Sequence, residues 1–160
     1  MSANGSTRSK WAATVSGSVP APPDEVFALV TDIARLPEWN SALKRVIEQP
    51  AALQPGVEWV VRIRPAGWPG WASRSRLEEL DPRRRVFRHR STAEDRNPSY
   101  AEWRWQVEPD ADGSRLTVSW ELHPKTVGRR LLAAPLRHRR LVRVEVPDSI
   151  AALASLFARR

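Results

Sequence analysis

The sequence predicts an α+β domain in which a curved antiparallel sheet of about seven strands wraps around one long C-terminal helix. Short segments with alternating apolar and polar residues follow one another between Leu43 and His123, and tight turns separate them. Only one long helical pattern comes after them. Because an antiparallel sheet must bury one of its faces, the apolar stripe of that helix is the natural cover.

The chain is expected to form one domain. Residues 1–10 carry no apolar pattern and are expected to be a disordered leader, which leaves residues 11–160 as a single domain of ordinary size. Trp11 to Val19 alternates and predicts the first strand, with Val15, Gly17 and Val19 on one face.

Two short helices should follow the first strand. Pro22 and Pro23 suit a first helical turn, where a missing N–H has no cost, and two acidic residues follow them. Thr31 and Asp32 can cap the second helix. That helix should end near the motif LPEWN, because Pro37 disfavours helical geometry in the residue before it.

Strands and turns fill the middle of the chain. Pro/Gly pairs mark most of the turns, and an Asp112-Gly113 pair is typical of a hairpin. Within each segment the apolar residues alternate, which places them on one face of the sheet. Strands are expected over Leu43–Gln49, Val57–Arg64, Trp71–Leu80, Arg84–Ser91, Tyr100–Pro109 and Ser114–His123.

The last part of the chain should be helical. A short approach over Thr126–Ala134 leads into a long helix over Leu136–Arg159. Pro147 removes a backbone hydrogen bond inside this helix and predicts a kink. The expected apolar stripe consists of Val142, Val146, Ile150, Leu153 and Phe157.

The composition excludes several classes of protein. A hydrophobic content of 41% with 28% charged residues indicates a soluble globular domain. The chain has no cysteine, which excludes disulfides and thiolate nucleophiles and favours a cytoplasmic localisation. No apolar run is long enough to span a membrane, and the N-terminus lacks the apolar segment of a signal peptide.

Several motifs, taken in order, resemble the SRPBCC superfamily, which has the START-like or helix-grip fold. The most specific is VSGSVPAPPDEVFALVTDIARLPEW, and GVEWVVRIRP, WASRSRLEELDP and WRWQVEPDADGSRL continue the pattern. The match covers nearly the whole chain after the leader. It is closest to the polyketide cyclase/dehydrase and lipid-transport branch of the superfamily.

The resemblance implies an apolar cavity between the sheet and the C-terminal helix. Members of the superfamily bind lipids, sterols, polyketides or other hydrophobic molecules, and some catalyse cyclisation, dehydration or hydrolysis. The competing interpretation is that the inward side chains fill this space completely. The residues expected to line the cavity are Trp59, Trp71, Ser73, Ser75, Phe87, His89, Trp103, Trp105, Trp120, Val142 and Val146.

Two further tryptophans are candidates for the cavity mouth. Trp68 lies in a Pro/Gly loop, and Trp39 ends the second short helix, where it could equally anchor that helix. Aromatic walls of this kind suit flat, apolar ligands.

His89 is the one histidine expected to face inward, so it is the candidate acid or base, against a purely structural role. Ser73 and Ser75 could hydrogen-bond a ligand, but no G-x-S-x-G motif indicates a nucleophile. The resemblance places Ser75 where aromatase/cyclase members have an inward arginine, which argues against cyclase chemistry. Arg74 and Arg76 should point outward, unless a one-residue bulge reverses them.

No metal and no cofactor are expected. The three histidines are widely separated, and neither H-E-x-x-H nor a phosphate-binding glycine loop is present. Glu78 and Glu79 are adjacent, so in a strand they should face opposite sides and form no catalytic pair.

The net charge of +8 comes almost entirely from arginine. Genomic codon bias is the favoured explanation, and an anionic partner is the other. Sequence-specific nucleic-acid binding is not expected, because no helix-turn-helix or zinc module is visible. The arginine clusters, expected to be solvated or else to contact an anionic membrane, are Arg83–Arg85 and the set Arg129, Arg130, Arg137, Arg139, Arg140 and Arg143.

The sequence therefore favours a protein that binds or carries a hydrophobic small molecule, such as a lipid or polyketide, in an internal cavity. The alternative is a cofactor-free cyclase or dehydratase that acts in the same cavity with His89 as acid or base. A second alternative is a basic surface that binds anionic membrane or nucleic acid. No oligomeric state is predicted.

Overall fold

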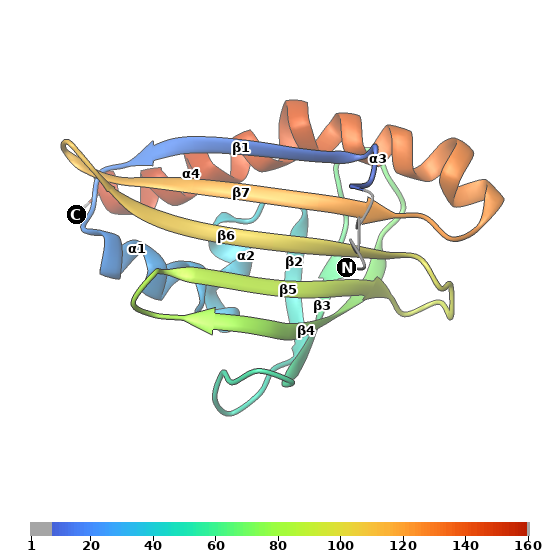
Figure 1. Ribbon diagram of the computed structural model, residues 1–160, viewed down its shortest axis with the longest axis horizontal. Coiled ribbons are helices and arrows are strands. Elements are labelled where there is room, and N and C mark those ends of the chain that lie inside the picture. The colour runs from blue at the N-terminus through green and yellow to red at the C-terminus, as the bar shows by residue number, and fades with distance from the viewer. Residues whose placement is uncertain (1–7, 160) are drawn as a thin grey trace, which may run out of the picture.

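A seven-stranded antiparallel sheet organises the chain, of which the computed structural model describes residues 8–159. The strand order is β1-β7-β6-β5-β4-β3-β2, so every neighbour except β1 and β7 is adjacent in sequence. The sheet curves, and β2 and β3 lie behind the strands at its centre (Figure 1). The strands are β1 (Ala12–Val19), β2 (Leu43–Glu48), β3 (Glu58–Ile63), β4 (Trp71–Asp81), β5 (Val86–Ala93), β6 (Tyr100–Asp110) and β7 (Gly113–His123).

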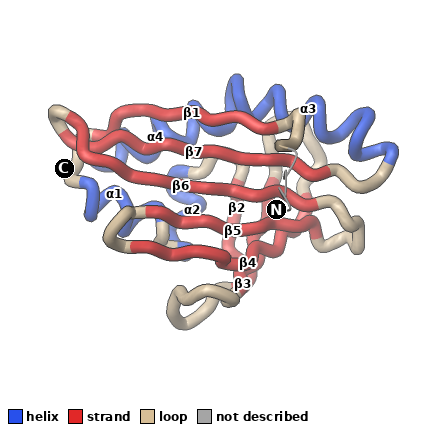
Figure 2. Tube along the Cα trace, in the orientation of Figure 1, coloured by secondary structure: helices blue, strands red, loops and turns tan. Residues whose placement is uncertain are grey.

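Helices cover one face of this sheet. The C-terminal helical segments run along β1 and β7, and the short helices close one end of the curve (Figures 1 and 2). This arrangement confirms the predicted fold class. The helical elements are α1 (Pro23–Val30), η1 (Ile33–Arg35), α2 (Leu36–Trp39), η2 (Arg129–Ala133), α3 (Ala134–Arg140), η3 (Leu141–Glu145) and α4 (Val146–Ala158).

The covered face of the sheet carries the aromatic residues. Across β5, β6 and β7, Trp103 pairs with His89 on one side and with Trp120 on the other. Phe87 pairs with Trp105 in the neighbouring position of the same face. Since side chains alternate along each strand, these pairs place one continuous aromatic row under the helices.

The C-terminal helix differs from its prediction because two of its segments are π-helical. The helix begins before Leu136. The π-helical segment η2 ends two residues before Pro135, and η3 ends two residues before Pro147, so each proline lies in the first turn of the α-helix that follows. A proline cannot donate to the carbonyl four residues back and its ring clashes with that group, and a wider π turn accommodates both problems. The irregularity expected at Pro147 therefore takes the form of the π-helical segment η3.

The π turn in η3 also moves the apolar stripe by one residue. Leu141 is 2% exposed, whereas Val142, which was expected on the stripe, is 37% exposed. Bonding from residue i to i+5 places Leu141 above Val146, a position that Val142 would take in a regular α-helix. The prediction that Val142 lies inside is wrong.

The second short helix does not stop where Pro37 suggested. Leu36 has φ −51° and ψ −41°, and it begins α2 instead of ending the helix. Pro37 sits in the first turn of α2, where its missing N–H leaves no bond unmade. Neither Thr31 nor Asp32 provides a side-chain cap, since the Thr31 hydroxyl donates to the carbonyl of Phe27.

A bulge in β4 decides which charged residues face outward. The register with β5 shifts between Leu77 and Glu79, so Glu78 is the extra residue. Glu78 and Glu79 both reach Arg88 at 3.9 and 3.2 Å, so the prediction that they face opposite sides is wrong. Because the bulge follows Leu77, the earlier part of β4 keeps its expected alternation.

Most of the predicted leader, residues 1–7, lies outside the described residues. The end of that segment contacts β7, because the Ser9 hydroxyl donates to the carbonyl of Leu122 at 2.5 Å. Within residues 8–159, no helix is long and apolar enough to cross a membrane.

Candidate functional site

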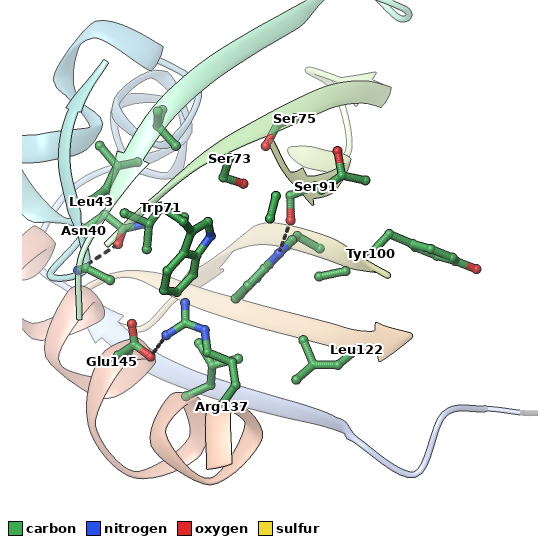
Figure 3. Close-up of a pocket in the computed structure, with 18 of the residues that line it drawn as sticks. Asn40, Leu43, Trp71, Ser73, Ser75, Ser91, Tyr100, Leu122, Arg137 and Glu145 are labelled. Atoms are coloured by element: carbon green, nitrogen blue, oxygen red, sulfur yellow. Dashed lines mark hydrogen bonds and ion pairs between the residues drawn. The ribbon is translucent and has the colours of Figure 1, made fainter. Parts of the chain in front are cut away.

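A cavity of about 430 Å³ lies between the curved sheet and the C-terminal helix. This volume falls near the lower end of the range of about 300–1,000 Å³ that small-molecule pockets occupy. Side chains from α1, α2, the strands β2 to β7 and the helical segments η2 to α4 line it. Figure 3 shows the cavity with sheet residues on one side and Arg137 and Glu145 of the helix on the other.

Stacked aromatic rings form the wall that belongs to the sheet. The rings of Trp103 and Trp105 lie 6.1 Å apart at 20°, and those of Trp59 and Phe87 lie 5.8 Å apart at the same angle. His89 lies 5.2 Å from both Trp59 and Phe87 and continues the row. A wall of nearly parallel rings offers flat faces to a flat apolar ligand.

The structure brings together most of the predicted cavity residues. Trp120 is an exception: its ring lies behind Trp103 at 5.9 Å, and its indole N–H donates to Nδ1 of His138 at 3.3 Å. Val142 is the other exception, because it points to solvent. That the remaining residues contact a ligand stays a prediction. The predicted residues that line the cavity are Trp59, Trp71, Ser73, Ser75, Phe87, His89, Trp103, Trp105 and Val146.

The two tryptophans predicted at the mouth occupy different places. Trp39 is 2% exposed and packs edge-to-face against Trp105 at 5.5 Å, so it is a buried part of the cavity wall and does not lie at a mouth. Its indole N–H has no hydrogen-bond partner in the described part of the chain. Trp68 is half-buried in the loop between β3 and β4, and it faces Arg129 and Ala133 across the opening.

His89 is half-buried in the cavity wall, and its imidazole is neutral. Nε2 of His89 accepts the indole N–H of Trp105 at 3.2 Å, so the imidazole proton resides on Nδ1. Burial lowers the pKa of His89 to about 3. A histidine with this pKa is a weak base and holds no second proton at neutral pH, so it serves as a fixed hydrogen-bonding group. Its Nδ1 has no partner among residues 8–159.

The protein is expected to lose stability in acid through His89. The folded pKa of about 3 lies below the ordinary histidine pKa of 6.5, so protonation favours the unfolded chain. This contribution is fully present above pH 6.5 and is lost as the pH falls, by about 1.4 kcal/mol per pH unit. Urea unfolding at about pH 7 and about pH 4.5 should show the loss.

His89→Gln is the matched variant, because it cannot titrate. The decrease in unfolding free energy between the two pH values should be smaller in this variant than in the wild type by about 2–3 kcal/mol. His138, whose pKa burial also lowers, remains in both proteins and cancels in the comparison. Equal decreases in the two proteins would contradict the assignment.

A strip of hydroxyl groups interrupts the apolar wall. Ser75 and Ser91 face each other across β4 and β5, and Ser73 lies two residues along the same face. The Ser91 hydroxyl accepts the indole N–H of Trp103 at 3.3 Å. The Ser73 and Ser75 side chains have no hydrogen-bond partner among residues 8–159, although both are less than 5% exposed. These two hydroxyls are available to a bound molecule.

Arg74 and Arg76 do not enter the cavity. Arg74 forms ion pairs with Glu48, Glu58 and Glu94 on the outer face of the sheet, and hydrogen bonding to Glu94 raises the pKa of this guanidinium. The outward direction predicted for Arg74 is confirmed, and Ser75 occupies the inward position between the two arginines.

An ion pair inside the cavity was missed in the sequence. Arg137 and Glu145 pair through Nη1 and Oε2, with side chains 17% and 6% exposed. The Arg137 guanidinium also lies 5.3 Å from the ring centre of Trp71 (Figure 3). The second oxygen of Glu145 has no hydrogen-bond partner among the described residues. Arg137 was assigned to a solvated face, and that assignment is wrong.

The outer surface brings three potential metal ligands together. Ligand atoms of Glu102, Glu121 and His123 lie within 4.8 Å of one another. Arg90 donates to Glu102 at 3.0 Å and the Ser9 amide donates to Glu121 at 2.6 Å, so both carboxylates already have partners. Hydrogen bonds within the protein therefore explain why these three side chains lie together.

Comparison with known proteins places the chain among related folds. The family described as "Polyketide cyclase / dehydrase and lipid transport" matches residues 10–157. No curated protein matches the chain in sequence. The crystal structure of the Zhui aromatase/cyclase from Streptomyces sp. R1128 is similar with a TM-score of 0.67 at 20% identity, over 93% of this chain and 94% of that chain.

Two other solved structures extend the comparison. Ara h 8.0201 is similar with a TM-score of 0.69 at 15% identity, over 93% of this chain and 98% of that one. The di-domain ARO/CYC StfQ from the steffimycin biosynthetic pathway has a TM-score of 0.69 at 14% identity, over 92% of this chain and 50% of that one. At these identities the likeness establishes the fold and nothing further.

Proposed function

The chain belongs to the polyketide cyclase/dehydrase and lipid transport family, and on this premise we propose that it binds one small hydrophobic molecule in its cavity. The observation that carries the proposal is the cavity of about 430 Å³ with stacked indole rings along one wall. A space of this size suits a molecule of a few fused rings better than a phospholipid with two acyl chains.

The polar groups in the cavity indicate which substituents a bound ligand should carry. The free hydroxyls of Ser73 and Ser75 lie on the sheet side, and the Arg137–Glu145 pair lies on the helix side. A ligand with keto or hydroxyl groups on its rim can satisfy these groups, and leaving them unpaired has a cost of about 1–3 kcal/mol each. The chemistry therefore favours a flat aromatic molecule with oxygen substituents, of the polyketide type, over a plain hydrocarbon chain.

Blocking the cavity should abolish binding. Ser75→Phe places a ring where the hydroxyl now faces the cavity, and it is expected to weaken ligand binding by at least about tenfold, a change of about 1.4 kcal/mol. Native mass spectrometry after incubation with anthraquinones, flavonoids and fatty acids identifies a ligand, and tryptophan fluorescence then gives its affinity.

Ser18→Phe is the matched control, because Ser18 is exposed on β1 and the same ring is added outside the cavity. This variant should bind as the wild type does. If Ser75→Phe binds equally well, or if no compound in the series binds the wild type, the cavity is not a ligand site.

An enzyme of the cyclase type is the second candidate, and the Arg137–Glu145 pair favours it. A guanidinium beside the ligand can stabilise the negative charge that develops on an enolate oxygen during cyclisation. Once a polyketone that binds is identified, product formation by the wild type and by Arg137→Met and His89→Ala tests this role. Full turnover by His89→Ala would remove His89 from the chemistry.

A further inference from the structure

Four large apolar side chains lie exposed where the C-terminal helix begins. Val127 is 70% exposed, Leu131 68%, Leu132 67% and Leu136 52%. Val127 and Leu131 are four residues apart, as are Leu132 and Leu136, so the members of each pair are neighbours on the helix surface. In Figure 1 these first turns, in orange, lie at the end of the sheet where β7 ends. Contiguous apolar side chains of this size on a surface mark an interaction site.

Unpaired arginines surround this apolar face. Arg130, Arg139 and Arg143 are exposed, and none has an acidic partner among residues 8–159. The chain as a whole carries a net charge of +8. An apolar helix face with arginines at its margin matches a bilayer that contains anionic lipids, whereas two copies of this face would bring their arginines together.

A groove connects the apolar face to the cavity. Leu132 and Leu136 line this groove together with Trp68, Arg129 and Ala133. The last three residues also line the cavity itself, so the two spaces meet beside the loop that carries Trp68. A hydrophobic ligand dissolved in a membrane would reach the cavity along this groove without crossing water.

We propose that the docking face, defined as Val127, Leu131, Leu132 and Leu136 with Arg130, Arg139 and Arg143, binds the surface of anionic lipid bilayers. The groove is then the route by which a ligand passes between the bilayer and the cavity, and this second statement rests on the proposed function. The four apolar side chains insert among the lipid chains, and the arginines contact the lipid phosphates.

Sedimentation with vesicles tests the docking face directly. The wild type should bind vesicles of phosphatidylcholine with about 30% phosphatidylglycerol, and it should bind pure phosphatidylcholine at least about tenfold more weakly. The double variant Leu131→Asp/Leu132→Asp should lose at least about tenfold in affinity for the anionic vesicles. Ile47→Asp, at a position that is 42% exposed on β2, should bind as the wild type does.

A second pair of variants separates the local arginines from overall charge. Arg130, Arg139 and Arg143, changed together to Gln, should weaken vesicle binding by at least about tenfold. The matched control changes Arg45, Arg83 and Arg159, which are exposed elsewhere, and removes the same charge. Equal losses in both triple variants would show general charge attraction and would overturn the docking face.

Other partners give different outcomes in the same series. If the wild type is dimeric in light scattering without vesicles, and Leu131→Asp/Leu132→Asp is monomeric, a second copy covers the face and the proposal is wrong. If a DNA or RNA duplex competes with the vesicles and the leucine variant binds the duplex normally, the arginines serve nucleic acid instead. Ser75→Phe should still bind vesicles, so failure of the cavity proposal is distinguishable from failure of the docking face.

Discussion

Replacing Arg137 by methionine is expected to lower the free energy of unfolding by about 3 kcal/mol, because it leaves the Glu145 carboxylate buried without its partner. Glu145 is 6% exposed and its second oxygen is already unpaired. Arg140 lies 4.0 Å from Glu145 and supplies some compensation, which places the expected loss at the low end for a broken buried pair. Urea unfolding at neutral pH measures the loss.

The double variant Arg137→Met/Glu145→Leu shows whether the loss comes from the unpaired charge. Apolar residues of similar size replace both charges, so the double variant should regain most of the stability that Arg137→Met loses. Arg139→Met, on the exposed side of the same helix, should change stability by less than about 0.5 kcal/mol. If Arg137→Met is as harmless as Arg139→Met, water screens the pair and the cavity has no buried charge.

Strand parity explains why the sheet side of the cavity could be predicted. Side chains two residues apart share a face, so Trp103 and Trp105, or Ser73 and Ser75, must enter the cavity together. The bulge at Glu78 has no sequence signal of its own, but it falls after Leu77 and leaves this part of β4 in register. A bulge before Ser75 would have changed which β4 side chains enter the cavity.

The helix side of the cavity could not be predicted in the same way. Predicting an apolar stripe requires a constant number of residues per turn, and the π-helical segment η3 breaks this regularity. Leu141 therefore takes the buried position that was predicted for Val142. Arg137 and Glu145 are eight residues apart, and both line the cavity. A carboxylate beside Val146 on the apolar stripe was the available signal for this pair.

The protonation state of His89 depends on residues that are distant in the sequence and could not be predicted from it. Its inward direction follows from β-strand alternation, but its protonation follows from the rings that enclose it and from the hydrogen bond to Trp105. The same rings separate the two interpretations of the aromatic face. A cavity and a filled core predict the same alternation, and only the volume between sheet and helix distinguishes them.

Trp105→Ala is expected to lower the free energy of unfolding by about 3–5 kcal/mol, the cost of truncating a large buried aromatic residue. Trp105 is 7% exposed, packs edge-to-face against Trp39 and stacks on Trp103. Its removal also takes the hydrogen-bond donor from His89. The loss should lie near the lower end of this range, because one side of the ring already borders the cavity and fewer contacts disappear.

Two control variants divide this loss into its parts. Trp105→Phe keeps an aromatic ring but leaves Nε2 of His89 unpaired, and it should cost about 1–3 kcal/mol. Trp68→Ala, in the half-buried loop at the mouth, should cost less than about 1 kcal/mol. A loss above about 5 kcal/mol for Trp105→Ala would indicate a ring packed on every side, as a filled core requires. A smaller loss, together with tighter binding of bulkier aromatic ligands by the enlarged cavity, supports Trp105 as part of its wall.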